Sequence, residues 1–185
     1  MQATLLDVEH AFRQLEFAIK LNCFCEKKHL DKDQFDADVL IVLEEQNIGF
    51  AEGGFRSYDE IIMASLVNIG ICFGVSATVL DADLEEAGTN RNPGSRDPND
   101  ALRTLVYMVR CAFAHNFANP RWNVRRQYAH VITLNLENEL LTVDLATLNE
   151  LEFDYCHIGG FANWYKIRGM AVRMIEKCLA FRPPR

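Results

Sequence analysis

Proline and glycine are scarce in this chain, with 5 and 10 among 185 residues. That content is too low for a low-complexity linker, and no internal repeat is present. Apolar residues make up 49% and charged residues 24% of the sequence, a balance that argues against intrinsic disorder. The length suits one domain of ordinary size, so we expect residues 1–185 to form a single unit.

Several sequence signals for targeting, cofactors and metals are also missing. The first residues lack the basic and apolar segments of a secretory signal, and the six cysteines are scattered, which predicts reduced thiols in a cytoplasmic protein. Cys23, Cys25 and His29 have no second ligand pair at zinc-site spacing, so no metal is expected. The chain has no Walker loop, dinucleotide fingerprint or nucleophile elbow, and we expect no cofactor.

Lysine is absent from residues 91–126, whereas arginine is concentrated there. The formal net charge is −7, which by itself argues against a nucleic-acid partner. Seven arginines against only Asp97 and Asp100 nevertheless give this stretch five excess positive charges. Arginine binds phosphate or carboxylate through two parallel hydrogen bonds, so the cluster is either such a site or a solvated face. The arginines are Arg91, Arg96, Arg103, Arg110, Arg121, Arg125 and Arg126.

Apolar spacing of three and four residues predicts a mainly helical fold. Ser57 with Glu60, and Asp97 with Pro98, are typical helix starts. The run Val39–Leu43 is compatible with a buried strand or a short helix. The fold expected is an up-and-down bundle of about four helices, with a β-hairpin before the last. The predicted ranges are helices at 4–28, 57–87, 98–116 and 161–180, and a hairpin at about 128–146.

The segment from Ile61 to Leu80 carries no charge over 20 residues, which is long enough to cross a bilayer. Its flanks are acidic, however, and they show neither a positive-inside signal nor an aromatic belt. A helix that is apolar on all sides also suits the centre of a bundle. We therefore expect a buried central helix and no membrane partner.

The predicted 98–116 helix has one apolar face, formed by residues such as Leu105 and Val109. At about 100° per residue, Arg110 and His115 lie roughly 140° apart on the opposite, outer face. The small residues Cys111 and Ala114 lie between them, which leaves room for a partner helix or a substrate. We expect a homodimer that uses this outer face, because two facing copies can complete a composite pocket.

The stretch from Met108 to Asn116, MVRCAFAHN, resembles the R-x4-6-H signature of the HEPN superfamily, with Arg110 and His115 at the two named positions. The following FANPRW segment at 117–122, the hairpin and the last helix after Gly159-Gly160 are similar to one bacterial branch of that superfamily. The resemblance implies a helical bundle, usually dimeric. Its members are often metal-independent endoribonucleases that act as toxins, some with a cognate antitoxin, or as defence effectors.

The chemistry of RNA cleavage agrees with these residue types. RNA supplies its own nucleophile, the 2′-hydroxyl, so cleavage requires only a positioned base and a cation. Histidine takes or returns a proton near neutral pH, which is the role expected of His115. Arg110 is expected to hold the scissile phosphate and neutralise its developing charge. The residues expected to bind the substrate around this pair are Arg103, Tyr107, Asn116, Arg121 and Trp122.

One residue departs from the pattern of the active members of the superfamily. They commonly place Asn, Asp or His directly after the motif arginine, whereas this chain has Cys111. The alternative is therefore a non-catalytic HEPN-like module that binds RNA or nucleotides, or mediates dimeric interactions. The neighbouring genes would distinguish the ribonuclease from the binding module, because an adjacent gene for an antidote favours a toxin.

Overall fold

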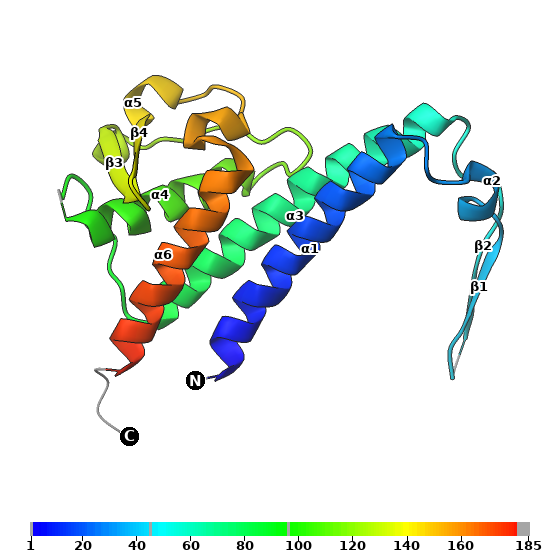
Figure 1. Ribbon diagram of the computed structural model, residues 1–185, viewed down its shortest axis with the longest axis horizontal. Coiled ribbons are helices and arrows are strands. Elements are labelled where there is room, and N and C mark those ends of the chain that lie inside the picture. The colour runs from blue at the N-terminus through cyan, green and yellow to red at the C-terminus, as the bar shows by residue number, and fades with distance from the viewer. Residues whose placement is uncertain (1, 45, 96, 181–185) are drawn as a thin grey trace.

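A computed structural model describes residues 2–44, 46–95 and 97–180, and the fold is mainly helical (Figure 1). The order along the chain is two helices, a hairpin, two helices, a second hairpin and two more helices, with two short 3-10 turns. The bounds are α1 Gln2–Glu26, α2 Lys32–Phe35, β1 Val39–Val42, β2 Asn47–Phe50, α3 Tyr58–Glu86, α4 Pro98–Phe113, η1 Arg126–Tyr128, β3 Val131–Leu136, β4 Glu139–Asp144, α5 Leu145–Leu148, η2 Tyr155–Ile158 and α6 Gly160–Ala180.

Local capping explains where α3 and α4 begin. The Ser57 hydroxyl accepts a hydrogen bond from the Glu60 backbone N–H, as expected for a residue that precedes a helix. The Asp97 carboxylate accepts one from the Asn99 N–H, and Pro98 occupies the first turn of α4. The expectations for both starts are confirmed, and so is the extent of the last helix.

The end of α4 differs from the prediction, because the helix stops at Phe113 rather than near Asn116. The Asn116 side chain accepts hydrogen bonds from the N–H groups of Ala118 and Asn119, at 3.0 Å each. This local turn competes with helical bonding. The Arg121 N–H then donates to the Ala112 carbonyl at 3.1 Å, so the chain folds back along α4.

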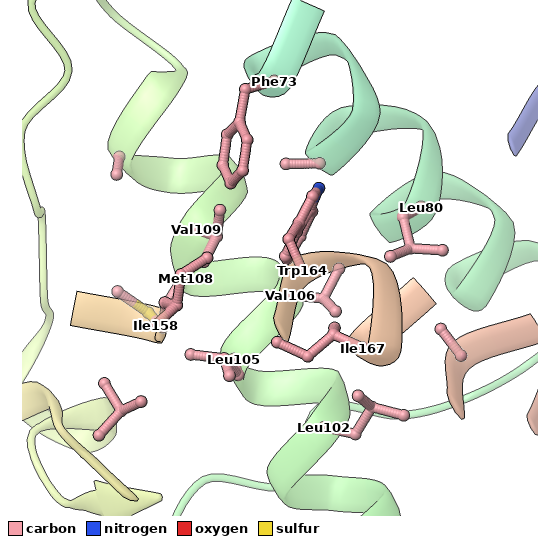
Figure 2. Close-up of a cluster of buried hydrophobic side chains, with 14 of the residues drawn as sticks. Phe73, Leu80, Leu102, Leu105, Val106, Met108, Val109, Ile158, Trp164 and Ile167 are labelled. Carbon is pink, nitrogen blue, oxygen red and sulfur yellow. The ribbon is translucent and has the colours of Figure 1, made fainter. Parts of the chain in front are cut away.

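Long α1 and α3 lie side by side, and α4 and α6 pack on α3 (Figure 1). Helix α6 also contacts α1, where the Tyr165 hydroxyl donates to the Phe12 carbonyl at 3.3 Å. Figure 2 shows Trp164 of α6 inserted between α3 and α4, with Phe73 above it. Its indole N–H donates to the Ser76 hydroxyl at 2.9 Å, which satisfies two buried polar groups. The apolar face predicted for α4 packs into this core, since Leu105 and Val109 are fully buried.

Two antiparallel hairpins complete the fold. The predicted one joins β3 to β4 through Glu137 and Asn138, which both have positive φ as a two-residue hairpin turn requires. Its β3 strand alternates exposed and buried side chains and packs on α4. The other hairpin, β1–β2, shows that Val39–Val42 is a strand rather than a helix, but the expected burial was wrong, because every residue of β1 is exposed. This hairpin was not predicted as a pair.

Candidate functional site

The candidate site lies where α4 ends and the chain turns back along it. Arg110 is half-buried in the last turn of α4, and His115 is exposed two residues beyond Phe113. The backbone of residues 123–128 runs beside the outer face of the helix, and Tyr107 and Tyr128 contact each other with ring centres 5.4 Å apart. This face is therefore partly covered by the chain itself rather than left open for a partner helix.

A hollow of about 340 Å³ lies between α4 and that returning segment. Cys111 and Ala114 line it, as expected for a floor of small residues, and Arg110 and Arg125 line it with their positive charge. No carboxylate lines the hollow. The full lining is Tyr107, Met108, Arg110, Cys111, Ala114, His115, Asn123, Arg125 and Tyr128.

A larger hollow of about 640 Å³ shares His115 and Asn123 with the smaller one, so His115 stands where the two adjoin. Its lining is rich in side-chain amides. Two of these amides have their oxygen engaged: Asn116 in the turn after α4, and Asn149 with the Val124 N–H at 2.9 Å. The full lining is Ala112, His115, Asn116, Asn119, Arg121, Trp122, Asn123, Val124, Asn149 and Glu150.

The arginine cluster does not form one continuous basic surface. Arg121 pairs with Glu152 at 2.9 Å, and Arg91 pairs with Glu85 at 3.2 Å while its guanidinium lies 4.3 Å from the Tyr107 ring centre. Arg96 lies outside the described residues. Arg110 and Arg125 form no ion pair with any residue that the structure describes. These two guanidiniums are the ones that remain available to an anion in the smaller hollow.

Tyr107, predicted as a substrate-binding residue, lines the smaller hollow as a neutral phenol. A hydrogen bond with the Cys111 side chain, and then burial, raises the pKa of Tyr107 above its ordinary value. The Cys111 thiol therefore contacts another residue of the same hollow.

Arg103 corrects the sequence analysis, which placed this residue on the outer face of α4. Its side chain is 0% exposed and pairs with Asp81 of α3, with Glu85 3.6 Å away. A buried guanidinium needs such a partner, because an unpaired charge in the core is strongly destabilising. Arg103 thus holds α3 against α4 and does not reach either hollow.

Trp122 was predicted to contact the substrate, but its ring belongs to the core. The side chain is 1% exposed, stacks near Phe153 with ring centres 5.1 Å apart, and donates from its indole N–H to His157 Nδ1 at 3.0 Å. Trp122 still borders the larger hollow as one of its lining residues. Asn116 and Arg121, by contrast, are exposed where the sequence predicted accessible groups.

Sequence reasoning did not single out Asn123, Asn149 or Arg125, each of which lines one or both hollows. The turn after α4 and the bridge between Arg121 and Glu152 bring these residues to the site from separate loops. The only signal in the sequence was the recurrence of asparagine and arginine between residues 116 and 126. In the described ranges, no group of three or more His, Cys, Asp or Glu side chains could hold a metal ion.

A scan against protein-family models found no match, and neither the curated proteins nor the solved structures contain one.

Proposed function

We propose that this protein is a HEPN-type, metal-independent endoribonuclease in which His115 and Arg110 form the catalytic pair. The observation that supports this most is the position of His115 between two adjoining hollows. A strand of RNA needs room on both sides of the scissile phosphate. Two arginines without carboxylate partners border one side, and amides border the other.

The proposed reaction is attack by the 2′-oxygen on the adjacent phosphorus. A base removes the 2′-hydroxyl proton as the new P–O bond forms, and the bond to the 5′-oxygen breaks as that oxygen receives a proton. The products are a 2′,3′-cyclic phosphate and a 5′-hydroxyl. Arg110 and Arg125 neutralise the phosphate, and His115 serves in proton transfer.

The wider biological setting belongs to the same proposal. The long helices would follow the up-and-down order of the HEPN bundle, and the protein would act in the cytoplasm on RNA as a toxin or defence effector. A cognate antitoxin would then be encoded by an adjacent gene. A solitary gene would instead favour a binding or interaction module.

Cleavage of a labelled single-stranded oligoribonucleotide in EDTA tests the mechanism. We expect a 2′,3′-cyclic phosphate product, and a rate about 100-fold or more lower for His115→Ala, the usual scale for losing an acid–base group. The cleavage rate of Arg110→Ala should fall comparably, and Arg110→Lys should recover only part of that rate, because lysine lacks the two-pronged donor geometry of arginine.

Two comparisons decide the outcome of this experiment. Arg125→Ala should reduce cleavage, whereas Arg126→Ala should not, since Arg126 is exposed next to it but lines neither hollow. Activity that disappears in EDTA and returns with Mg²⁺ or Mn²⁺ contradicts the mechanism. Protein that binds the RNA without cutting it supports the non-catalytic alternative, for which Cys111 in place of a polar residue is the specific observation.

A further inference from the structure

The hairpin β1–β2, which we call the arm (residues 39–44 and 46–50), projects from the far end of the α1–α3 pair and stands clear of the core (Figure 1). Side chains alternate between the two faces of a strand, and in β1 both faces are apolar and exposed. The large apolar side chains of the arm are 38–71% exposed. They are Val39, Leu40, Ile41, Val42, Leu43, Ile48 and Phe50.

The two ends of the arm are held to each other at its base. The Asp36 carboxylate accepts hydrogen bonds from the Gly54 and Phe55 N–H groups at 3.0 Å, and Phe35 contacts Phe55 with ring centres 5.8 Å apart. An isolated two-stranded hairpin is only marginally stable in water. Monomers also rarely expose a contiguous apolar patch larger than a few hundred Å². An arm of this composition therefore needs a cover.

The same chain carries a second uncovered apolar surface on α3. Its five residues, which we call the α3 row, are 37–57% exposed and span 12 positions, about 18 Å along a helix. A strand the length of residues 39–43 extends about 16 Å. The two surfaces therefore match in length and chemistry, and the arm of the same copy leaves the row exposed. The row is Met63, Leu66, Val67, Ile71 and Val75.

We infer that the arm of one copy packs on the α3 row of a second copy, and the reverse, so that two exchanged arms form a homodimer. Such a reciprocal contact closes on itself through two-fold symmetry. One face of the arm carries most of its large apolar side chains, because residues opposite each other in the hairpin lie on the same side; they are Val39, Ile41, Leu43, Ile48 and Phe50. These five and the five of the α3 row are about half exposed on average. If a large apolar side chain has on the order of 150 Å² to bury, the pair of copies covers roughly 1,400 Å². Stable interfaces bury about 1,200–2,000 Å².

Charge argues for a second copy rather than a lipid surface as the occupant. Asp36, Asp38, Glu44 and Glu52 lie in or beside the arm, and the chain carries −7 overall, so anionic lipids would repel it. The α3 row offers an uncharged surface between Ile61 and Leu80. This location replaces the outer face of α4 that the sequence suggested, which the chain's own segment 123–128 partly covers.

The α3 row continues to the candidate site through Phe117. A Cβ added at Gly70 would lie 3.0 Å from the Phe117 carbonyl oxygen, and one at Gly74 would lie 2.7 Å from its ring, so Phe117 covers both glycines. Met63 and Val67 precede these glycines by about one to three turns on the same side of α3. Phe117 is 40% exposed and follows His115 by two residues, which places the exchanged arm beside the site.

Sedimentation equilibrium of the purified full chain at tens of micromolar tests the dimer, with no reference to RNA cleavage. We expect twice the chain mass for wild type, and a single chain mass for Ile41→Glu, on the larger apolar face of the arm, and for Met63→Lys. Mixing these two variants should restore a dimer, because one contact is then wild type and the other pairs opposite charges. Leu140→Glu is the matched control, since Leu140 is 71% exposed on the other hairpin and should leave the dimer intact.

Circular dichroism and melting curves establish that each variant is folded, and a variant with residues 38–51 replaced by a short Gly-Ser linker repeats the test. A monomeric wild type overturns the inference. Open-ended polymers do so too, as does equal dissociation by Leu140→Glu or failure of the mixed variants to associate. Because the readout is mass, an inactive but dimeric protein would count against the proposed ribonuclease function alone.

Discussion

At the residue scale, Asp83 is a carboxylate whose environment disfavours its charge. It lies buried on α3, and its Oδ2 has no hydrogen-bond partner among the described residues. Burial, with smaller contributions from the charges of Asp7 and Glu86, raises the pKa of Asp83 to about 6. The unfolded chain releases that proton near pH 4.

This difference in pKa makes stability depend on pH. Between about pH 4 and 6 the folded protein keeps a proton that the unfolded chain has lost, so the free energy of unfolding falls as pH rises through that window. We expect Asp83→Asn to melt at a higher temperature than wild type at pH 7.5, and at the same temperature near pH 4. Thermal melts at the two pH values check this. An equal difference at both would mean that ionisation is not the cause.

A neighbouring residue provides the control. Asp81→Asn changes the same chemical group two residues away, but Asp81 is the partner of buried Arg103. Its loss should lower the melting temperature at pH 7.5, the opposite sign, because the guanidinium loses its counter-charge. The sequence could not distinguish these two aspartates. Only packing decides which carboxylate faces Arg103 and which faces other carboxylates.

At the element scale, the contact between α3 and the end of α4 depends on Gly74. A Cβ at that position would lie 2.7–2.9 Å from ring atoms of Phe117 and Phe113. Gly74→Ala should therefore destabilise the protein by about 1–3 kcal/mol through overpacking, although alanine favours helix by about 1 kcal/mol. Urea denaturation measures the change in the free energy of unfolding.

Gly169 in α6 is the matched comparison for that substitution. The nearest atom to its added Cβ is the flexible end of Arg173 at 3.5 Å, so Gly169→Ala should be neutral or stabilising by up to about 1 kcal/mol. If both substitutions stabilise the protein, Phe117 has moved aside without cost and the close contact does not matter. Loss of stability in both would indicate a general effect of alanine rather than this contact.

Several elements could be predicted from the sequence because their signals are local. Ser57 and Asp97 fix helix starts through their own side chains, and Glu137-Asn138 fixes a hairpin turn. The β1–β2 pairing could not be predicted, because Val39–Leu43 is apolar at every position and so lacks the alternation that marks a half-buried strand. The end of α4 was misplaced for a similar reason, since the Asn116 turn competes with a helix that the sequence pattern allowed to continue.

The candidate site was only partly accessible to the same reasoning. Arg110, Cys111, Ala114 and His115 are close in sequence, and this proximity brings all four to the smaller hollow although α4 ends at Phe113. Arg125 and Asn149 reach the hollows from loops whose course depends on tertiary contacts, among them the hydrogen bond from the Val124 N–H to Asn149. Arg103 was assigned to the wrong face because its ion pair with α3 is not visible in the spacing of α4.

At the scale of the whole molecule, the environment of α3 distinguishes a protein folded in water from one that spans a membrane. Among the described residues it is the one helix long and apolar enough to cross a membrane. Its polar groups, however, are used within the fold. Ser65 donates to Asn22 of α1 at 2.9 Å, Ser76 accepts from Trp164 of α6, and Asp81 pairs with Arg103 of α4. A membrane-spanning α3 would lose all three contacts at once.

We therefore expect the untagged protein in the supernatant after lysis without detergent, and no protein retained by membranes washed with alkaline carbonate. The physical reason is that α3 packs against α1, α4 and α6, and each contact satisfies a polar group that lipid would leave unpaired. Ile41→Glu, which changes the arm and leaves α3 intact, distinguishes membrane binding by the arm from membrane binding by α3. Wild type held on membranes and released by this variant would indicate a lipid-bound arm. Protein that only detergent extracts, with or without the variant, would mean that α3 spans the bilayer and that the packing around Trp164 does not form in the cell.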